Sequence, residues 1–181
     1  MEIKADNQYH IYNRGNNRET IFITEANYFY FKNKIQKHIS PYADILAYCL
    51  MPNHFHIQLL TSIDFDKNKF INSYRIMLSS YTRAINRQCK RVGSLFQQNS
   101  KCIDLFKTSD HDYPFICFNY IHKNPIKGKL IDKLEDWQFS SFNEYYQNIT
   151  GICNVNKGRE LLNLPNNPDD FYKISHEQIH E

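Results

Sequence analysis

The sequence predicts an α+β fold in which a ferredoxin-like antiparallel sheet, with the order β-α-β-β-α-β, is followed by an added helix. Two observations favour this fold class. Short β-like runs alternate with segments whose apolar residues recur every three to four positions, and the two middle runs are joined by a very short connector. A sheet with two helices on one face fits this order and leaves the other face available for the added helix or a ligand.

The first strand is predicted at residues 8–13, where QYHIYN alternates. The following RGNN is typical of a turn, with Gly15 at the position that permits unusual backbone angles. The first helix is predicted over residues 25–39 and stops before Ser40-Pro41, because proline does not continue a helix. Its apolar and aromatic residues, spaced by three or four positions, are Tyr28, Phe31, Ile35 and Ile39.

The next two strands are predicted at residues 44–50 and 54–60. The connector Met51-Pro52-Asn53 between them is short, so the two runs form a tight hairpin. A long amphipathic helix follows and ends at Gly93, with arginines on its opposite side. Its apolar stripe consists of Phe70, Tyr74, Met77, Leu78, Tyr81 and Ile85.

A fourth strand is predicted at residues 94–106, from the run SLFQQNSKCIDLF. A third helix is predicted to begin at a cap on Asp110 and to end at Asn124-Pro125, because the residue before a proline disfavours helical angles. The segment WQFSSFNEYYQ, beyond Trp137, suggests one more short helix.

The chain has 181 residues, of which 41% are hydrophobic and 23% charged, so it has the material for one folded domain. We expect this domain over residues 1–144, followed by a polar C-terminal extension of unknown role over residues 145–181. No apolar run approaches the roughly 18 residues that a membrane span needs, and no secretion signal is visible. The expected location is the cytoplasm, with no membrane partner.

The cysteines and glycines exclude several classes of protein. The five cysteines are widely spaced and contain no C-x-x-C pair, which favours neither a disulfide framework nor a zinc ribbon and indicates a reducing compartment. The five glycines form neither G-x-G-x-x-G nor the phosphate loop G-x-x-x-x-G-K. We therefore expect no nucleotide cofactor.

Positive charge is concentrated between Asn72 and Lys107, although the net charge of the whole chain is only +3. The single acidic residue of this segment is Asp104. The basic residues are Arg75, Arg83, Arg87, Lys90, Arg91, Lys101 and Lys107. A polyanion-binding face, which releases counterions from phosphates, and an ordinary solvated helix face both fit this pattern. The basic patch alone does not decide between them.

Two histidines are predicted to project side by side from the third strand. Alternate residues of a strand share a face, so His54 and His56 point one way while Phe55 points into the core. Two imidazoles in this arrangement suit a divalent ion with open positions for water and substrate. Histidines that simply form hydrogen bonds at a sheet surface would give the same pattern.

Tyr120 and Asn124 are four residues apart, so the third helix places them on one face, one turn from each other. If that face packs over the third strand, Asn124 completes a set of two histidines and one amide, and Tyr120 reaches a phosphate for covalent phosphodiester cleavage. Pro125 makes this spacing approximate. With 13 tyrosines in the chain, a role for Tyr120 as core or surface filler stays open.

Four segments occur in order between about residues 8 and 143: YHIYNRGNNRETIF, MPNHFHIQLL, NYIHKNPIKGKL and DWQFSSF. Together they resemble the single-tyrosine HUH transposases, and especially the REP-associated tyrosine transposases. The resemblance implies that His54 and His56 bind a divalent metal, Mg²⁺ or Mn²⁺, and that Tyr120 is the nucleophile. It places Asn124 as the third ligand and Phe55 in the hydrophobic slot between the histidines.

The resemblance also implies a reaction and its partners. The substrate is single-stranded DNA that forms hairpins, and the strand is cut and rejoined through a 5′-phosphotyrosine without ATP. A homodimer is consistent with the family. Base stacking is expected from Phe96 and Tyr113. Phosphate contacts are expected from Arg14, Arg18, Arg75, Arg83, Arg87, Lys90 and Arg91.

Three other functional interpretations fit parts of the sequence. His176-Glu177-Gln178-Ile179-His180 satisfies the metalloprotease pattern H-E-x-x-H, but it lies at a terminus with no downstream ligand. A nuclease built on carboxylates would use Asp64, Asp66, Asp110 and Asp112, which lie in polar, loop-like segments. A ferredoxin-like module that binds DNA or RNA hairpins without cutting them is the alternative from a different class.

Overall fold

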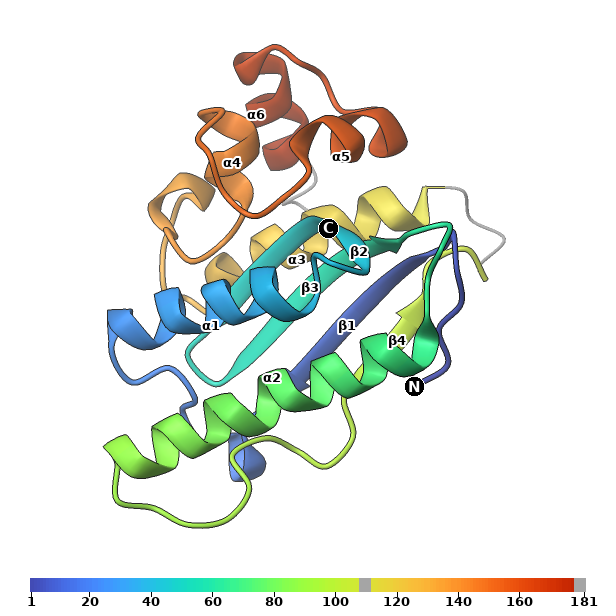
Figure 1. Cartoon of the computed structure of the whole chain (residues 1–181). Coiled ribbons are helices and arrows are strands. Elements are labelled where there is room, and N and C mark those ends of the chain that lie inside the picture. Colours follow the sequence, from blue (N-terminus) through green and yellow to red (C-terminus); the bar gives the residue numbers. More distant parts are fainter. Residues whose placement is uncertain (108–111, 178–181) are drawn as a thin grey trace.

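The computed structural model describes residues 1–107 and 112–177, and it confirms the predicted α+β class (Figure 1). The elements follow in this order: β1 Gln8–Arg14, η1 Asn16–Arg18, α1 Glu25–His38, β2 Ala43–Met51, β3 His54–Thr61, α2 Lys67–Gln88, β4 Lys101–Asp104, α3 Tyr113–Lys127, η2 Leu134–Asp136, α4 Phe142–Tyr146, α5 Val155–Leu162 and α6 Pro168–Glu177.

The four strands form one antiparallel sheet in the order β2-β3-β1-β4. This is the order expected when each helix crosses from one strand to a strand that is not its neighbour. Helices α1 and α2 cover one face of the sheet, and α3 crosses the other face, packed chiefly against β2 and β3 (Figure 1). The two strands β1 and β4 therefore have little helical cover on the α3 face.

Each face of the sheet has its own hydrophobic cluster. The first cluster fills the space under α1 and α2 and includes Phe31, Phe55 and Tyr81. The second cluster lies between β2, α3 and the C-terminal helices and includes Phe118 and Phe171. Burial of side chains of this size stabilises the fold by about 1.5–3 kcal/mol each, so both layers contribute to stability.

Helix α2 begins at a well-formed N-cap. The carboxylate of Asp66 accepts hydrogen bonds from the backbone N–H groups of Asn68 and Lys69, both at 3.0 Å. These bonds satisfy donors that have no partner inside the helix. Asp66 is thus a helix cap, as expected for a carboxylate in a polar loop, and Asp64 is exposed. Asp110, the predicted cap of the third helix, lies outside the described residues.

Three local predictions for the part of the chain before α3 are wrong. Helix α2 ends at Gln88 and not at Gly93. Gly15 has φ −61°, so it does not need unusual backbone angles; a Cβ at this position would instead collide with the carbonyl oxygen of Glu19, which explains the glycine by close approach. The fourth strand is confined to Lys101–Asp104. The preceding segment is a loop that is held to the end of β1 by separate hydrogen bonds, such as that from the backbone N–H of Gln97 to the carbonyl oxygen of Arg14, and by an isolated bridge between Gly15 and Phe96.

The described part of the polar C-terminal segment, residues 145–177, contains more ordered structure than its composition suggests. Helices α5 and α6 pack against β2 and α4, and Leu162, Leu164 and Phe171 are buried in the second cluster. Within the described residues, no helix is long and apolar enough to cross a membrane.

Candidate active site

The sequence predicted that the third helix ends at Asn124-Pro125. This prediction is wrong, because α3 continues to Lys127. Pro125 lacks the N–H that would bond to the carbonyl of Ile121. The side-chain amide of Asn124 compensates, because its Nδ2 donates to the carbonyl oxygens of Tyr120 at 2.8 Å and of Ile121 at 3.4 Å. The amide nitrogen of Asn124 is therefore engaged with the helix, and its oxygen remains available to the site.

His54 and His56 project from the same face of β3, with ring centroids 5.1 Å apart. Nδ1 of His54 lies 2.6 Å from Oδ1 of Asn53. Since that amide oxygen only accepts, His54 carries its hydrogen on Nδ1, and Nε2 keeps a lone pair. Burial lowers the pKa of both imidazoles, and neighbouring Arg14 lowers it further, so both rings are neutral at pH 7 and suited to bind a metal.

His10 on β1 lies directly behind His56, and sequence reasoning missed it. Nε2 of His10 is 2.8 Å from Nδ1 of His56, and both rings are buried. When His56 donates from Nδ1, its Nε2 is left as a lone pair toward the cavity. Burial lowers the pKa of His10 to about 4, which keeps it neutral and able to accept that hydrogen. The alternation of QYHIYN places His10 on one face of its strand, but it does not predict which residue His10 contacts.

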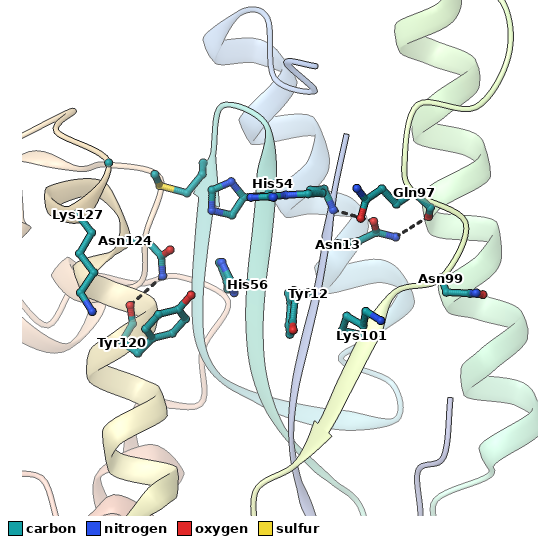
Figure 2. Close-up of a pocket in the computed structure, with 13 residues that line it drawn as sticks. Tyr12, Asn13, His54, His56, Gln97, Asn99, Lys101, Tyr120, Asn124 and Lys127 are labelled. Carbon is teal, nitrogen blue, oxygen red and sulfur yellow. Dashed lines mark hydrogen bonds between the residues drawn. The ribbon is translucent and has the colours of Figure 1, made fainter. Parts of the chain in front are cut away.

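Tyr120 projects from α3 toward the histidines (Figure 2). Its ring centroid is 5.6 Å from that of His56 in an edge-on contact, and Nζ of Lys127 lies 5.3 Å from the Tyr120 ring centroid. The side chain is 41% exposed, so a substrate can reach it. Burial and the nearby Tyr12 phenol raise the pKa of Tyr120, whereas a hydrogen bond with Asn124 and the charge of Arg14 oppose this rise.

Asn124 links the two halves of the site. Its side chain favours the charged forms of both His54 and Tyr120, so it opposes the effect of burial on both pKa values. The predicted approach of Tyr120 and Asn124 to the third strand is therefore seen in the structure, although Pro125 lies inside the helix.

These groups line a cavity of about 490 Å³ between α3, β1, β3 and the loop before β4 (Figure 2). Arg14, Lys101 and Lys127 give it a positive rim, and of the described lining residues none is Asp or Glu. Sequence reasoning assigned no site role to Lys101 or Lys127. The further lining residues that it missed are Tyr12, Asn13, Met51, Gln97, Asn99 and Gly128. Strand register is the missing signal, because it places Tyr12 opposite His56 and Arg14 opposite His54.

The donor set fits a divalent cation. His54, His56 and Asn124 each have one side-chain nitrogen engaged by the protein and one atom with lone pairs left over. Such outer hydrogen bonds are what orients metal ligands in proteins. Among the described residues, no group of three His, Cys, Asp or Glu side chains could hold a metal, so a third protein ligand here would be the Asn124 oxygen. Two imidazoles with an amide oxygen suit Mn²⁺ as well as the harder Mg²⁺.

The other predicted DNA-binding residues are dispersed. Arg75, Arg83, Arg87 and Lys90 are exposed on or just after α2, on the opposite side of the sheet from the cavity. Arg18 is exposed in the turn after β1, near the end of the sheet where His54 lies. Arg91 forms an ion pair of 2.9 Å with Glu19 of that turn. The structure brings only Arg14 into the cavity.

The two aromatic residues expected to stack on bases differ in accessibility. Phe96 is buried in the first cluster against Phe31 and Tyr81, so its predicted stacking on bases is wrong. Tyr113 is half-buried at the start of α3 and remains accessible. The H-E-x-x-H motif at residues 176–180 lies partly outside the described residues, and Nδ1 of His176 lies 2.8 Å from the carbonyl oxygen of Tyr172.

The sheet, the histidine pair on β3 and the tyrosine on the helix beside it agree with the class of protein that the sequence predicted, a transposase. The sequence profile of IS200-like transposases matches residues 4–124, and the chain belongs to this family. Its class of activity is therefore DNA transposition.

Two solved structures are similar to this chain. One is a REP-associated tyrosine transposase bound to a REP hairpin, with a TM-score of 0.62 and 21% identity, covering 80% of this chain and 81% of that one. The other is a putative transposase from Deinococcus radiodurans R1, with a TM-score of 0.43 and 17% identity, covering 64% of this chain and 89% of that one. The first likeness supports the fold. No curated protein matches the chain significantly.

Proposed function

We propose that the protein cleaves and rejoins single-stranded DNA in a metal-dependent reaction that passes through a 5′-phosphotyrosine. The observation that carries this proposal is the convergence of Tyr120, His54 and His56 on one cavity, with the Tyr120 ring 5.6 Å from that of His56. A hydroxyl nucleophile thus lies beside donor atoms suited to a divalent cation. This combination favours attack on a phosphodiester, because a cation on the phosphate reduces its repulsion of an anionic nucleophile.

The cavity also suits the proposed substrate. Arg14, Lys101 and Lys127 attract a polyanion, and Tyr120 lies between a helix and a sheet, where a strand can enter without its complement. The similar solved transposase is bound to a REP hairpin, which supports hairpin-forming DNA as the partner. We assign a contact with phosphates to Arg14 and Arg18, and a weaker, sequence-independent contact to the basic residues of α2 and its end.

The residues of the chain have distinct roles in the reaction. His54, His56 and Asn124 would hold Mg²⁺ or Mn²⁺, which when bound neutralises charge on the scissile phosphate. The Oη atom of Tyr120 attacks the phosphorus, the bond from phosphorus to the 3′ oxygen breaks, and the phenolic proton ends on that oxygen. The products are a 5′-phosphotyrosine and a free 3′ hydroxyl, so the diester bond energy is kept and the reverse step needs no ATP.

Arg14 and Asn124 assist Tyr120 directly. Burial raises the pKa of this phenol, so it is protonated at neutral pH and must lose its proton as it attacks. The side chain of Asn124 and the positive charge of Arg14 both act to lower the pKa of Tyr120, so both favour the phenolate and reduce the cost of that step. A hydrolase would require a positioned water and a general base, and the described residues that line the cavity include no carboxylate for this role.

A covalent-trapping experiment tests the proposal. The protein is incubated with Mn²⁺ and a library of hairpin oligonucleotides with randomised single-stranded flanks, and DNA that stays on the protein in a denaturing gel is sequenced. We expect an adduct with the parent protein and none with Tyr120→Phe, which keeps the ring but lacks the attacking oxygen. DNA binding by both proteins without any adduct would favour the non-catalytic hairpin-binding module.

Labelling the selected substrate on each side of the cut tests the polarity. We expect the label on the side that carries the 5′ phosphate to stay with the protein, and a second oligonucleotide with a 3′ hydroxyl to be joined without ATP. Retention of the other label, or accumulation of hydrolysed DNA alone, would contradict a 5′-phosphotyrosine even if Tyr120 is essential.

A further inference from the structure

A second hollow lies next to Tyr120, on the side of α3 that faces β1 and β4. It encloses about 310 Å³. It is lined on the helix by Tyr113, Ile116, Cys117 and Tyr120, and on the sheet by His10, Tyr12, His56 and Ile103. It exists because α3 packs chiefly against β2 and β3 and leaves the β1 and β4 half of this face with little cover. The cavity that holds the histidine pair has a cationic rim, whereas the described lining of this hollow includes no Lys, Arg, Asp or Glu and consists of tyrosine rings, two neutral imidazoles, two isoleucines and a cysteine.

The helical side of the hollow is a regular stripe. Tyr113, Ile116 and Tyr120 are spaced by three and four residues, so they share one face of α3. Ile116 is 42% exposed and lines the hollow. Surface of this kind next to a reacting group is expected to bind an apolar part of the substrate.

The two hollows share Tyr12, His56 and Tyr120, so one DNA strand can occupy both at once. A nucleotide has two parts that match them. Its phosphate is anionic and suits the cationic cavity, and its base has an apolar face that stacks on aromatic side chains whatever its sequence.

We propose that this hollow binds the base of the nucleotide immediately 3′ of the cut, which is the nucleotide that stays bonded to Tyr120. The inference rests on the proposed function. The leaving 3′ oxygen lies opposite the attacking Tyr120 oxygen and so points away from α3. The 5′ oxygen remains on the same phosphorus as Tyr120, and its nucleotide stays within one phosphodiester of the ring that forms a wall of the hollow.

The binding of this base also holds the covalent complex together. After the 3′ hydroxyl is released, the 5′ strand end is attached through one tyrosine side chain that can rotate. A base placed between the stripe of α3 and Tyr12 fixes the orientation of the phosphorus for the reverse attack. The hollow is thus expected to affect both cleavage and rejoining.

The test compares an intact substrate, selected from the hairpin library, with the same oligonucleotide carrying an abasic site directly 3′ of the cut. Because one stacked base is lost, we expect the parent protein to form the adduct about tenfold more slowly on the abasic DNA, which corresponds to about 1.4 kcal/mol. An abasic site directly 5′ of the cut should have a much smaller effect.

Ile116→Trp provides the complementary change, because the larger side chain fills the hollow. This variant should form the adduct at least tenfold more slowly than the parent on intact DNA, yet match the parent on the abasic substrate. Recovery on the abasic DNA also shows that the variant is folded and that Tyr120 is correctly placed. Ile149→Trp is the matched control, since Ile149 is similarly exposed, at 49%, and lies outside both hollows.

The outcomes separate the two hypotheses. Equal rates of the parent on intact and abasic DNA, or equal slowing of Ile116→Trp on both, would overturn the base-binding hollow while the Tyr120 adduct stands. Failure of the parent to form any Tyr120-dependent adduct would overturn the proposed function and this inference with it.

Discussion

The two faces of strand β3 are buried to a similar extent but differ in chemistry. Phe55 and Ile57 are fully buried under α1 and α2 in the first, apolar cluster. His56 and Gln58 are also buried, at 4% and 0% exposure, on the face that carries α3. Burial alone therefore does not distinguish the structural face of this strand from its functional face.

The difference lies in the partners that the buried groups require. An apolar side chain needs only close packing, whereas a buried imidazole or amide destabilises the fold unless it forms hydrogen bonds. His56 is paired with His10 from β1. Nε2 of Gln58 donates to Oε1 of Gln8, which also lies on β1, and to the carbonyl oxygen of Pro114 on α3. The functional face is thus tied to its neighbours by specific contacts, and a change there should act on the site more than on stability.

The sharpest test of this contrast compares alanine substitutions of two neighbouring residues of β3, Phe55 and His56. Phe55→Ala should lower the free energy of unfolding by about 3–5 kcal/mol, because it leaves a cavity in the first cluster. His56→Ala should cost about 1–3 kcal/mol, since His10 loses its partner, but should abolish metal-dependent cleavage.

Denaturant unfolding and Mn²⁺ calorimetry measure the two effects separately. Phe55→Leu serves as the control, because it keeps an apolar side chain and should retain Mn²⁺ affinity. Undiminished Mn²⁺ binding by both His56→Ala and His54→Ala would remove the metal site.

His10 tests whether the contacts behind the site matter as much as the residues in it. His10→Phe removes the acceptor for Nδ1 of His56, and we expect Mn²⁺ affinity to fall by about 10–100-fold. His10→Gln retains a side-chain acceptor and should lose much less.

His122→Phe is the matched control for His10. His122 is also a buried histidine of the α3 face, and Nε2 lies 2.7 Å from Oγ of Ser141, but it does not line the cavity. If His10→Phe and His122→Phe have the same Mn²⁺ affinity as the parent, His10 does not orient His56.

The pH dependence of stability provides a test of the buried imidazoles. Burial lowers the pKa of His122 to about 3, whereas the unfolded chain takes up this proton near pH 6.5. Between these values the unfolded state binds more protons, so the free energy of unfolding decreases as pH falls, by up to about 1.4 kcal/mol per pH unit for this group. In urea unfolding from pH 7 to 4, the free energy of unfolding of His122→Gln should depend less steeply on pH than that of the parent, by the slope that corresponds to one proton. Parallel profiles for the two proteins would show that His122 is protonated in the folded state.

The smallest effect is expected on the outer surface of α2. Replacing Arg83 and Arg87 with Ala should weaken the binding of unrelated hairpins several-fold and make the slope of log affinity against log salt shallower by about 1.5. The rate of adduct formation on saturating DNA should not change, because both residues lie on the opposite side of the sheet from Tyr120. An unaltered salt slope would support a solvated helix face.

Local patterns of the sequence determined most of the elements and half of the site. Alternation along β3 placed His54 and His56 on one face, and the spacing of four placed Tyr120 beside Asn124, because both periodicities depend only on the geometry of one element. The segments that resemble the transposase family lie in these elements, and the family assignment is confirmed.

Only the tertiary structure decided how these elements meet. His10 contacts His56 across 46 residues of chain, Lys101 joins the cavity from the edge strand, and Phe96 turns into the core. Each of these depends on strand register or on the side of the sheet that a segment covers, and no local period encodes either one. For the same reason the sequence showed a basic α2 but not that its arginines lie on the opposite side of the sheet from Tyr120. The packing of helices against the two faces of the sheet determined on which side these arginines lie.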